Sequence, residues 1–376
     1  MYRLVQRRGI IGLFCLLFVA SSVVPGWAQK DNRFEVSKNL DIFNSLLKEV
    51  EMFYVDSVDV DKTVQRGIEA MLAGLDPYTE YYPEQKTEEL SLMTTGEYGG
   101  IGSLIRQRNN EGGVMIAEPT EGMPADLAGL KPGDLILAID TIDVSKATNS
   151  RVSELLKGVP NTKMVLTIQR PGEKKPRKFE ITRKQITTPQ VTYYGVKNDS
   201  IGYIYLKAFT IKSAQEVKEA FLDLKKNHNI KSLVLDLRGN GGGVLEGAVQ
   251  IVGMFVPKGS EVLSTKGKIK QWDRTYRTST EPLDTVMPLA ILINGGTASA
   301  AEIVSGSLQD MDRAVLVGQR SFGKGLVQAP RDLPYNGKVK ITMSKYYIPS
   351  GRCIQQIDYS HRKEDGSVAA IPDSLT

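Results

Sequence analysis

The sequence predicts an α/β protein in which a layered α/β domain follows a small β-rich module and an N-terminal helical segment. From residue 187 onward, apolar strand segments alternate with helical ones, the pattern of a layered α/β domain. Between residues 89 and 186, short apolar strands are separated by Gly/Pro turns. Residues 29–88 are mostly helical in pattern. A chain of 376 residues is long enough for several such domains.

The first 28 residues have the pattern of a secretory signal peptide. Three arginines precede an uncharged apolar run over residues 9–24, and small residues stand before the expected cleavage point after Ala28. We therefore expect export, with a bacterial periplasm as the compartment. The alternative is an uncleaved inner-membrane anchor, because the run is only slightly shorter than a bilayer span. Membrane association is expected only in that case.

The mature chain has neither the charge expected of a nucleic-acid-binding protein nor many metal-binding side chains. Loss of residues 1–28 removes three arginines and no acid, so the formal net charge falls from +5 to +2. No basic stripe indicates a nucleic-acid partner. Only Cys353 remains, so no internal disulfide is expected. Two histidines and one cysteine provide few ligands for zinc, and we expect no metal or other cofactor.

The N-terminal segment is expected to hold two helices within residues 36–75. Apolar residues recur at helical spacing from Leu40 to Val50 and again from Val64 to Leu72. Asp76-Pro77-Tyr78 then breaks the helical pattern. Residues 78–95 are polar, and we expect them to form a linker.

Strands of the β-rich module are expected around the runs VMIAEP, DLILAIDTI, MVLTIQRP and KFEITRK. A short helical turn is expected at residues 123–130, followed by a tight turn at Pro132-Gly133-Asp134. In the α/β domain, helices are expected at Ser213–Lys226, around VLEGAVQIVGMF and around ASAAEIVSGSLQD. Strands are expected around IGYIYLKAF, SLVLDLR, PLAILIN and AVLVGQ.

The segment from Asn294 to Glu302 joins a buried strand to a helix and places Ser299 at the helix N-terminus. Free N–H groups and the helix dipole favour negative charge there, which suits a nucleophile whose reaction creates an oxyanion. Ser299-Ala-Ala-Glu302 is also a capping box, so Ser299 has a purely structural interpretation as a helix cap. On this segment alone, the capping interpretation is favoured.

A second segment, Gly318 to Gly325, nearly matches the P-loop pattern for nucleotide phosphates. The last position is Gly325 rather than Ser or Thr, so the hydroxyl that binds Mg²⁺ is missing. Lys324 is then either a solvated loop lysine or a general base whose pKa is lowered by burial.

A third segment, Asp236 to Gly243, ends a buried strand with four glycines. Such a turn lets the backbone approach a ligand closely and supply oxyanion-binding N–H groups. A structural tight turn explains it equally well. It is not a dinucleotide-binding motif, because Val244 stands where that motif needs glycine.

The two histidines stand apart from these segments. His228 follows two lysines at an expected helix end, and His361 lies in a charged stretch. Neither has a motif around it, so a Ser-His-Asp triad is poorly supported. A serine nucleophile here needs another base, and a lysine can serve.

Taken together, these segments resemble the C-terminal-processing peptidases, or tail-specific proteases. Thr297-Ala-Ser-Ala-Ala-Glu302 resembles the nucleophile segment of that family, and Phe322-Gly-Lys-Gly325 with Gln328 resembles its lysine segment. Leu75-Asp-Pro-Tyr-Thr79 resembles its N-terminal segment. The motifs that resemble its PDZ domain, its oxyanion turn and a later strand are Gly96–Gly102, Gly129–Asp134, Asp236–Gly243 and Pro349–Arg352.

The resemblance implies a serine endopeptidase with a crotonase/ClpP-like catalytic domain over residues 187–376 and a PDZ domain over residues 89–186. Ser299 is implied as nucleophile and Lys324 as general base. The remaining implied roles are orientation of the lysine by Gln328, an oxyanion hole of Gly242 and Ala300, and a peptide-carboxylate loop of Gly99, Gly100, Ile101 and Gly102. Implied partners are protein substrates bound through their C-termini. The sequence does not give the oligomeric state, and a homodimer through the N-terminal helices is a further expectation. The alternative is an inactive PDZ-containing scaffold protein.

This sequence departs from the family pattern at three places. Thr297 and Ala301 replace two serines that flank the nucleophile, and Ser103 follows the glycine loop where an apolar residue is expected. The chain ends at Thr376, before a further Gly-Ile-x-Pro-Asp segment that the resemblance implies. We therefore expect a shortened C-terminal part or a truncated chain.

Overall fold

The computed structural model describes residues 32–108 and 112–372. The expected signal peptide, residues 1–28, lies outside the described residues. The chain divides into two compact units at Ile68/Glu69. The first unit contains helix α2 (Arg33–Phe53), and helix α3 (Val60–Ala73) ends in the second unit. None of the helices in the described ranges is both long and apolar enough to span a membrane.

The segment after α3 is not the linker that the sequence predicts. It contains strand β1 (Glu80–Tyr82), a short 3-10 helix η1 (Glu84–Lys86) and helix α4 (Thr87–Thr95). Strand β1 pairs antiparallel with β18 (Lys338–Tyr347), so that Glu80 lies opposite Lys340. The polar composition of this segment gives no local signal for a strand, because the strand forms only by pairing with β18, which lies far along the chain.

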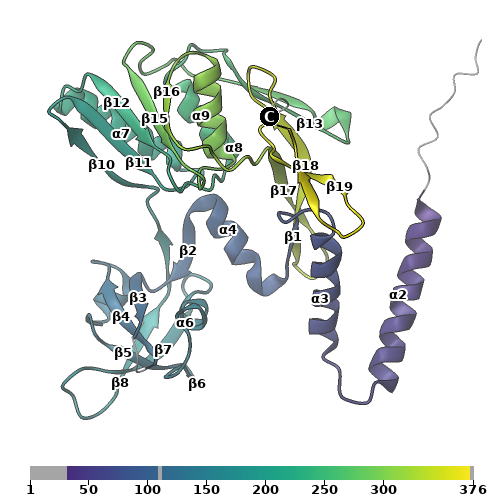
Figure 1. Cartoon of the computed structure of the whole chain (residues 1–376). Coiled ribbons are helices and arrows are strands. Elements are labelled where there is room, and N and C mark those ends of the chain that lie inside the picture. Colours follow the sequence, from purple (N-terminus) through teal and green to yellow (C-terminus); the bar gives the residue numbers. More distant parts are fainter. Residues whose placement is uncertain (1–31, 109–111, 373–376) are drawn as a thin grey trace, which may run out of the picture. The chain divides into compact units, whose positions relative to one another are not determined.

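The β-rich module forms a six-stranded antiparallel sheet with two helices, as the sequence predicts (Figure 1). Its edge strand β3 pairs only with β4, and its core is apolar and fully buried around Val114, Ile116 and Leu166. The elements are β3 (Ser103–Gln107), β4 (Val114–Pro119), α5 (Pro124–Leu127), β5 (Leu135–Ile139), β6 (Ile142–Asp143), α6 (Asn149–Leu156), β7 (Lys163–Gln169) and β8 (Arg177–Thr182).

Strands β2 (Glu97–Gly100) and β9 (Lys184–Thr187) pair antiparallel at the two ends of this module. The chain therefore enters and leaves the module side by side, as expected of a domain inserted into another. The expected boundaries at residues 88/89 and 186/187 stay predictions.

The α/β domain is built on a sheet with the strand order β10-β11-β12-β15-β16 (Figure 1). The last four strands run parallel, and β10 is antiparallel to β11. The strands are β10 (Val191–Lys197), β11 (Ile201–Leu206), β12 (Ser232–Asp236), β15 (Leu289–Ile293) and β16 (Val315–Gly318). The helices are α7 (Ser213–Asn227), α8 (Leu245–Gly253) and α9 (Ala300–Asp310).

A second sheet completes the domain. It has the order β1-β18-β13-β14, with β17 also paired to β18. The remaining elements are β13 (Glu261–Gly267), η2 (Lys270–Trp272), β14 (Arg274–Arg277), β17 (Leu326–Asp332), β19 (Ile357–Arg362) and β20 (Val368–Ala370). The main core packs α7, α8 and α9 against the first sheet and against β13 and Tyr346 of β18. The strand and helix alternation predicted from the sequence is confirmed.

Candidate active site

Three neighbouring parallel strands bring the three sequence motifs together. The glycine turn follows β12, the Ser299 segment follows β15, and the Lys324 loop follows β16. Because β15 lies between β12 and β16, all three segments leave the sheet at the same carboxyl edge. Open parallel sheets bind their ligands at this edge.

Ser299 has a strained backbone. It is the N-cap residue of α9, yet its φ is 56° and its ψ is −117°. An ordinary N-cap residue is extended with negative φ, and a non-glycine residue in such a sparsely populated region costs on the order of 1–3 kcal/mol. A sharp, strained strand-to-helix turn is also how α/β hydrolases expose a nucleophilic serine. This backbone favours a nucleophile over a simple helix cap, although the sequence lacks the glycines of that motif.

The glycine turn packs directly against the nucleophile turn. Asn240 O accepts from Ala298 N–H at 2.9 Å, and Leu237 O accepts from the Thr297 hydroxyl at 2.8 Å. A Cβ on Gly242 would lie only 2.7 Å from Ser299 Cβ and 2.9 Å from Ala300 N. Glycine is therefore required by close approach here. Thr297, which departs from the family pattern, keeps a hydroxyl with a structural partner.

The expected oxyanion donors are only partly available. No protein acceptor is found among the described residues for the N–H of Ala300. The Gly242 N–H, however, donates to Asn240 Oδ1 at 2.9 Å, so it is occupied in this arrangement. Gly241 and Gly243 line the pocket that contains Ser299, and their N–H groups have no acceptor in the described ranges. Among the residues that the structure describes, the glycine turn therefore has free N–H donors at Gly241 and Gly243, the neighbours of Gly242, and not at Gly242 itself.

Glu302 links the nucleophile turn to the lysine loop. Its buried carboxylate accepts from the N–H groups of Ser299 and Lys324 at 2.8 and 2.9 Å. It also accepts from Gly323 N–H at 2.6 Å and from the Ser321 hydroxyl at 2.7 Å. Burial raises the pKa of Glu302, and these four hydrogen bonds oppose that rise. The sequence shows only the capping half of this role.

Tyr346 forms a second link, which sequence reasoning missed. Its hydroxyl donates to Lys324 O at 2.6 Å and lies 3.2 Å from Ser299 O. The side chain is almost fully buried, and burial raises its pKa well above the ordinary value. A neutral phenol therefore ties together the main chains of the two proposed catalytic residues. No local motif marks this tyrosine, because it lies in an ordinary apolar strand.

Lys324 is partly buried, and its pKa is lowered to about 8. Burial is the largest cause, and the positive charge of Lys340 acts in the same direction. Asp76, Glu80 and Glu302 partly oppose the shift. The amine lies 4.3 Å from the centre of the Tyr78 ring. A lowered pKa and partial burial favour the general base of the two alternatives left open by the sequence, and the assignment stays a prediction.

Ser299, Lys324 and Gln328 line one pocket of about 440 Å³. No hydrogen bond joins the Lys324 amine to the Ser299 hydroxyl in the part of the chain that is described. Gln328 Nε2 donates to Thr342 Oγ1 at 3.1 Å rather than to Lys324. The pocket therefore holds the three residues together without the hydrogen bonds of a closed catalytic dyad. Its other walls come from α4, α8 and β18, including Met93, Leu245 and Lys340.

Neither histidine reaches this pocket. His228 ends α7, and half of its side chain is exposed. His361 lies in β19, where its Nδ1 is 2.7 Å from Asp358 Oδ2, and 86% of its side chain is exposed. The sequence prediction of surface histidines is confirmed.

The expected peptide loop of the β-rich module borders a small pocket of about 40 Å³. Gly100, Ile101 and Gly102 line it, together with residues of α6 such as Leu156. The N–H groups of Ile101 and Gly102 have no acceptor within the described residues. Gly99 does not line the pocket, and a Cβ there would lie only 1.8 Å from Gly158 O. Its glycine is explained by that close approach.

Comparison with known proteins agrees with this arrangement. Residues 200–360 match the model of peptidase family S41, and residues 115–170 match that of the PDZ domain. A carboxy-terminal-processing protease of Bartonella bacilliformis is 36% identical over 345 residues, which is 91% of this chain and 77% of that protein. The chain belongs to peptidase family S41. It is a serine-type peptidase with an inserted PDZ domain.

Two further proteins are similar to this chain. A probable CtpA-like serine protease of Staphylococcus aureus is 33% identical over 320 residues, which is 84% of this chain and 62% of that protein. The solved structure of the photosystem II D1 C-terminal processing protease has 29% sequence identity over 82% of each chain, with a TM-score of 0.46.

Proposed function

We propose that this S41 peptidase cuts peptide bonds with Ser299 as nucleophile and Lys324 as general base. The neutral Lys324 amine takes the proton from Ser299 Oγ while Oγ attacks the substrate carbonyl carbon. The resulting ammonium then gives its proton to the leaving amine as the peptide bond breaks. Water attacks the acyl-enzyme, and the same amine removes and returns a proton.

The oxyanion formed in each attack needs preorganised N–H donors. Ala300 N–H, at the start of α9, is one such donor. We expect the second from the glycine turn: either Gly242 after it leaves Asn240, or the neighbouring amide of Gly241 or Gly243. The helix dipole of α9 adds to the stabilisation of negative charge.

The single observation that carries the proposal is the shared pocket, which is lined by a strained serine and by a partly buried lysine of lowered pKa. A structural cap needs neither the strain at Ser299 nor the burial of a lysine beside it. An inactive scaffold protein would not explain the strained backbone of Ser299 or the lowered pKa of Lys324. A chain that binds tails but does not cut an unfolded substrate would favour that alternative.

We propose that the PDZ domain recognises substrates by their C-termini. Strand β3 is an edge strand, so an extended peptide can pair with it. The pocket beside it supplies the unoccupied N–H groups of Ile101 and Gly102 for the terminal carboxylate, and the apolar side chains of Ile105 and Leu156 for the last residue. An apolar C-terminal residue is therefore the expected tail.

Tail recognition is tested with two substrates of one sequence, an unfolded polypeptide with a free C-terminal carboxylate and the same polypeptide with a C-terminal amide. We expect amidation to lower kcat/KM about 10- to 100-fold, because hydrogen bonds to a charged group contribute about 1.5–3 kcal/mol. Equal cleavage of the two substrates would contradict recognition of the carboxylate. A tail of identical length ending in aspartate tests the apolar preference in the same assay.

We further propose that the protein works outside the cytoplasm, in a bacterial periplasm. The proposal rests on the signal pattern of residues 1–28 and on the lack of an internal disulfide partner for Cys353. An uncleaved anchor is the alternative, and fractionation of cells with N-terminal sequencing of the mature chain distinguishes them.

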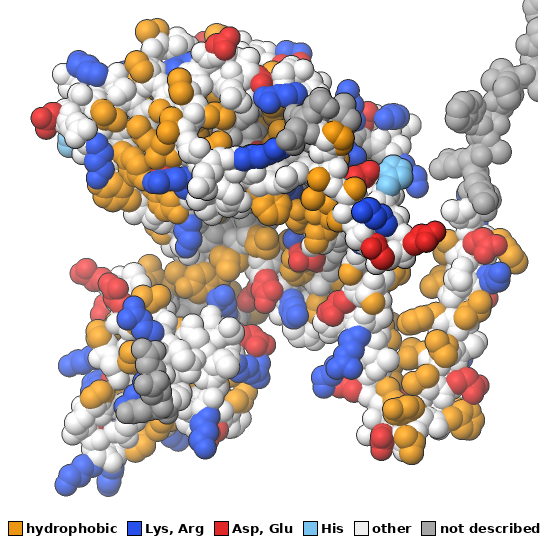
Figure 2. Space-filling view, in the orientation of Figure 1, with side chains coloured by type: hydrophobic (Ala, Val, Ile, Leu, Met, Phe, Trp, Pro, Cys, Tyr) orange, Lys and Arg blue, Asp and Glu red, His pale blue; other side chains and the backbone are white. Residues whose placement is uncertain are grey.

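We also propose a homodimer formed through α2. None of the residues of this helix is buried, although large apolar side chains such as Leu40 and Phe43 lie on it. Figure 2 shows apolar side chains gathered along this helix. Exposed apolar area of this kind costs free energy unless a partner covers it, and a second copy has the same helix to offer.

Light scattering after gel filtration of residues 29–376 tests the dimer. We expect the mass of two chains for the wild type and of one chain for the variant Leu40→Glu/Phe43→Glu. Ser45→Glu adds a charge to the opposite face of the same helix, at an exposed position, and is the matched control that stays dimeric. A monomeric wild type at micromolar concentration would contradict the proposal.

A further inference from the structure

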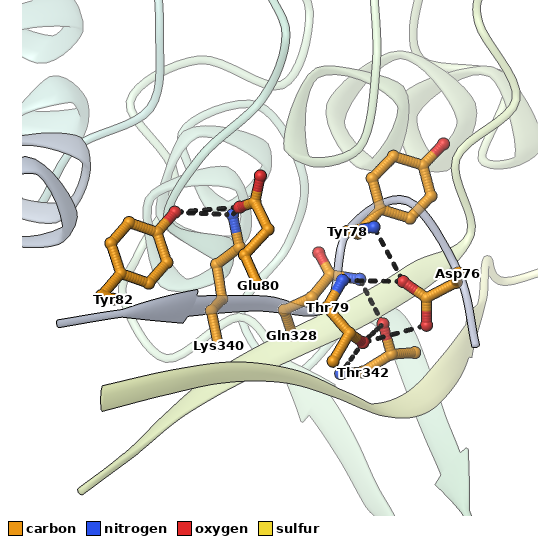
Figure 3. Close-up of polar contacts among 8 residues, drawn as sticks. All are labelled: Asp76, Tyr78, Thr79, Glu80, Tyr82, Gln328, Lys340 and Thr342. Carbon is orange, nitrogen blue, oxygen red and sulfur yellow. Dashed lines mark hydrogen bonds and ion pairs between the residues drawn. The ribbon is translucent and has the colours of Figure 1, made fainter. Parts of the chain in front are cut away.

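Residues 76–82 lie outside the segment that matches the peptidase family model, yet two of them contact residues that line the catalytic pocket, Lys324 and Lys340. Figure 3 shows the turn at Asp76–Thr79 and strand β1 against β18, with Thr79 beside Thr342 and Glu80 beside Lys340. The contacts involve Tyr78, Thr79 and Glu80. Tyr78 contacts the proposed base, Lys324. Thr79 is linked through Thr342 to Gln328, the residue expected to orient that base. Glu80 forms an ion pair with Lys340, the neighbouring positive charge.

The first contact covers the lysine. The Lys324 amine lies over the Tyr78 ring, 4.3 Å from its centre, which is within the range of a cation–π interaction. The Tyr78 ring is itself held edge-on against Tyr359, with ring centres 5.9 Å apart. Burial raises the pKa of Tyr78, so the phenol is neutral at any working pH. A rigid neutral ring therefore forms one wall of the site that the amine occupies.

The second contact is a chain of hydrogen bonds that ends at Gln328. Asp76 Oδ1 accepts from the N–H groups of Tyr78 and Thr79, both at 2.8 Å, and Asp76 Oδ2 accepts from the Thr79 hydroxyl at 3.0 Å. The Thr79 and Thr342 hydroxyl oxygens are 3.3 Å apart, and Thr342 N–H donates to Thr79 Oγ1 at 3.2 Å. Thr342 Oγ1 in turn accepts from Gln328 Nε2. The turn thereby fixes the side chain of Gln328 through Thr342 (Figure 3).

The third contact sets the charges around the amine. Lys340 forms an ion pair with Glu80, whose carboxylate also accepts from the Tyr82 hydroxyl at 2.9 Å. The charged groups that act on Lys324 are Lys340 on β18, Asp76 and Glu80 on the N-terminal segment, and Glu302 on α9. Two of these four belong to residues 76–82.

We propose that Tyr78 and Thr79 are positioning residues of the peptidase, Tyr78 by covering the amine of Lys324 and Thr79 by fixing Gln328 through Thr342. The inference rests on the proposed roles of Ser299 and Lys324. Its Thr79 half rests also on the role of Gln328 implied by the family resemblance, since Gln328 donates to Thr342 in this arrangement. It adds to the catalytic residues a segment that precedes the PDZ domain in the sequence. The site is therefore built from residues before and after the inserted domain.

The proposal predicts the direction of a pH effect. The base must be neutral to act, so kcat/KM rises with pH through the pKa of Lys324. Burial is the largest cause of the lowered pKa of Lys324. Removing the ring admits water to the amine, which raises the pKa toward the ordinary lysine value. Loss of the cation–π contact acts in the opposite direction, but at about 0.5–1 kcal/mol it is the smaller effect. The acid side of the pH profile must then move to higher pH, whereas a phenylalanine keeps the ring and the profile.

The test is the pH profile of cleavage by the whole mature chain, residues 29–376, carrying Tyr78→Ala or Tyr78→Phe. For Tyr78→Ala we expect a midpoint shifted by more than about half a pH unit to the alkaline side and a kcat lowered about tenfold or more, with KM little changed. For Tyr78→Phe we expect the wild-type midpoint. The folded fraction is measured by circular dichroism at each pH and the rates are divided by it, so that unfolding on the acid side cannot imitate the shift. If Tyr78→Ala does not fold, Tyr78→Leu replaces it in the same comparison.

Thr79 provides an independent comparison. Thr79→Val removes the hydroxyl at nearly constant volume, and Thr79→Ser keeps it; we expect kcat to fall only in the valine variant. A wild-type midpoint in Tyr78→Ala, or equal kcat in the two Thr79 variants, would overturn the corresponding half of the proposal. Ser299→Ala in the same assay tests the proposed function separately. If the Ser299→Ala chain still cuts, the proposed serine and lysine mechanism is wrong, whatever the variants of Tyr78 and Thr79 show.

Discussion

Replacement of Ser299 by alanine is expected to lower kcat/KM for an unfolded protein substrate by at least about 10⁴-fold, because loss of a nucleophile leaves only the oxyanion site and binding to act. The substitution removes Oγ without altering the hydrogen bond from the Ser299 N–H to Glu302. Folding is therefore expected to persist. Cleavage is measured from the disappearance of substrate and from the new N-termini.

Ser305→Ala is the matched control for this change. Ser305 lies in the same helix and donates to Ala301 O at 2.9 Å, but it does not line the catalytic pocket. We expect its activity to stay close to that of the wild type. Equal activity of Ser299→Ala and Ser305→Ala would remove Ser299 from the mechanism.

Replacement of Lys324 is expected to have the second largest effect, a loss of about 10²- to 10⁴-fold, the range for loss of a general base. Lys324→Met removes the amine, and Lys324→Arg keeps a cation that cannot act as a base at neutral pH. Both variants are therefore expected to be inactive, which separates the role of a base from that of a positive charge. Lys345→Met, on β18 but outside the catalytic pocket, is the matched control.

The wild-type pH profile carries the same information. With the pKa of Lys324 lowered to about 8, kcat/KM should rise about tenfold per pH unit below pH 8 and level off above it. An exposed lysine as base would move this rise beyond pH 10. A rise near pH 6.5 would point to histidine instead, and would contradict the assignment of the base.

The sequence predicts much of the catalytic domain because its strands and helices have clear periodicities. The order of strand and helix from residue 187 onward is confirmed, and so are the surface positions of both histidines. The motifs around Ser299 and Lys324 are found from the sequence because each combines a strand end with glycine or a capping residue. Their meeting at one sheet edge follows from the parallel order of β12, β15 and β16.

Other features of the site depend on contacts far apart in the sequence. Residues 78–95 appear polar and unstructured, yet β1 pairs with β18 across more than 250 positions. The strained φ of Ser299 and the role of Tyr346 have no local signal, because both are imposed by packing around the nucleophile turn. Gly242 also differs from its expected state, since only the structure shows its N–H bound to Asn240.

The central claim, a serine and lysine mechanism without histidine, is tested most directly by a chain that contains no histidine. The protein has two histidines, so His228→Ala/His361→Ala removes every imidazole from residues 29–376. We expect this chain to cut the unfolded substrate with the wild-type kcat/KM and the wild-type midpoint near pH 8, and to lose all cleavage once Ser299→Ala or Lys324→Met is added. A folded histidine-free chain that no longer cuts, or one that cuts without Lys324, would contradict the mechanism.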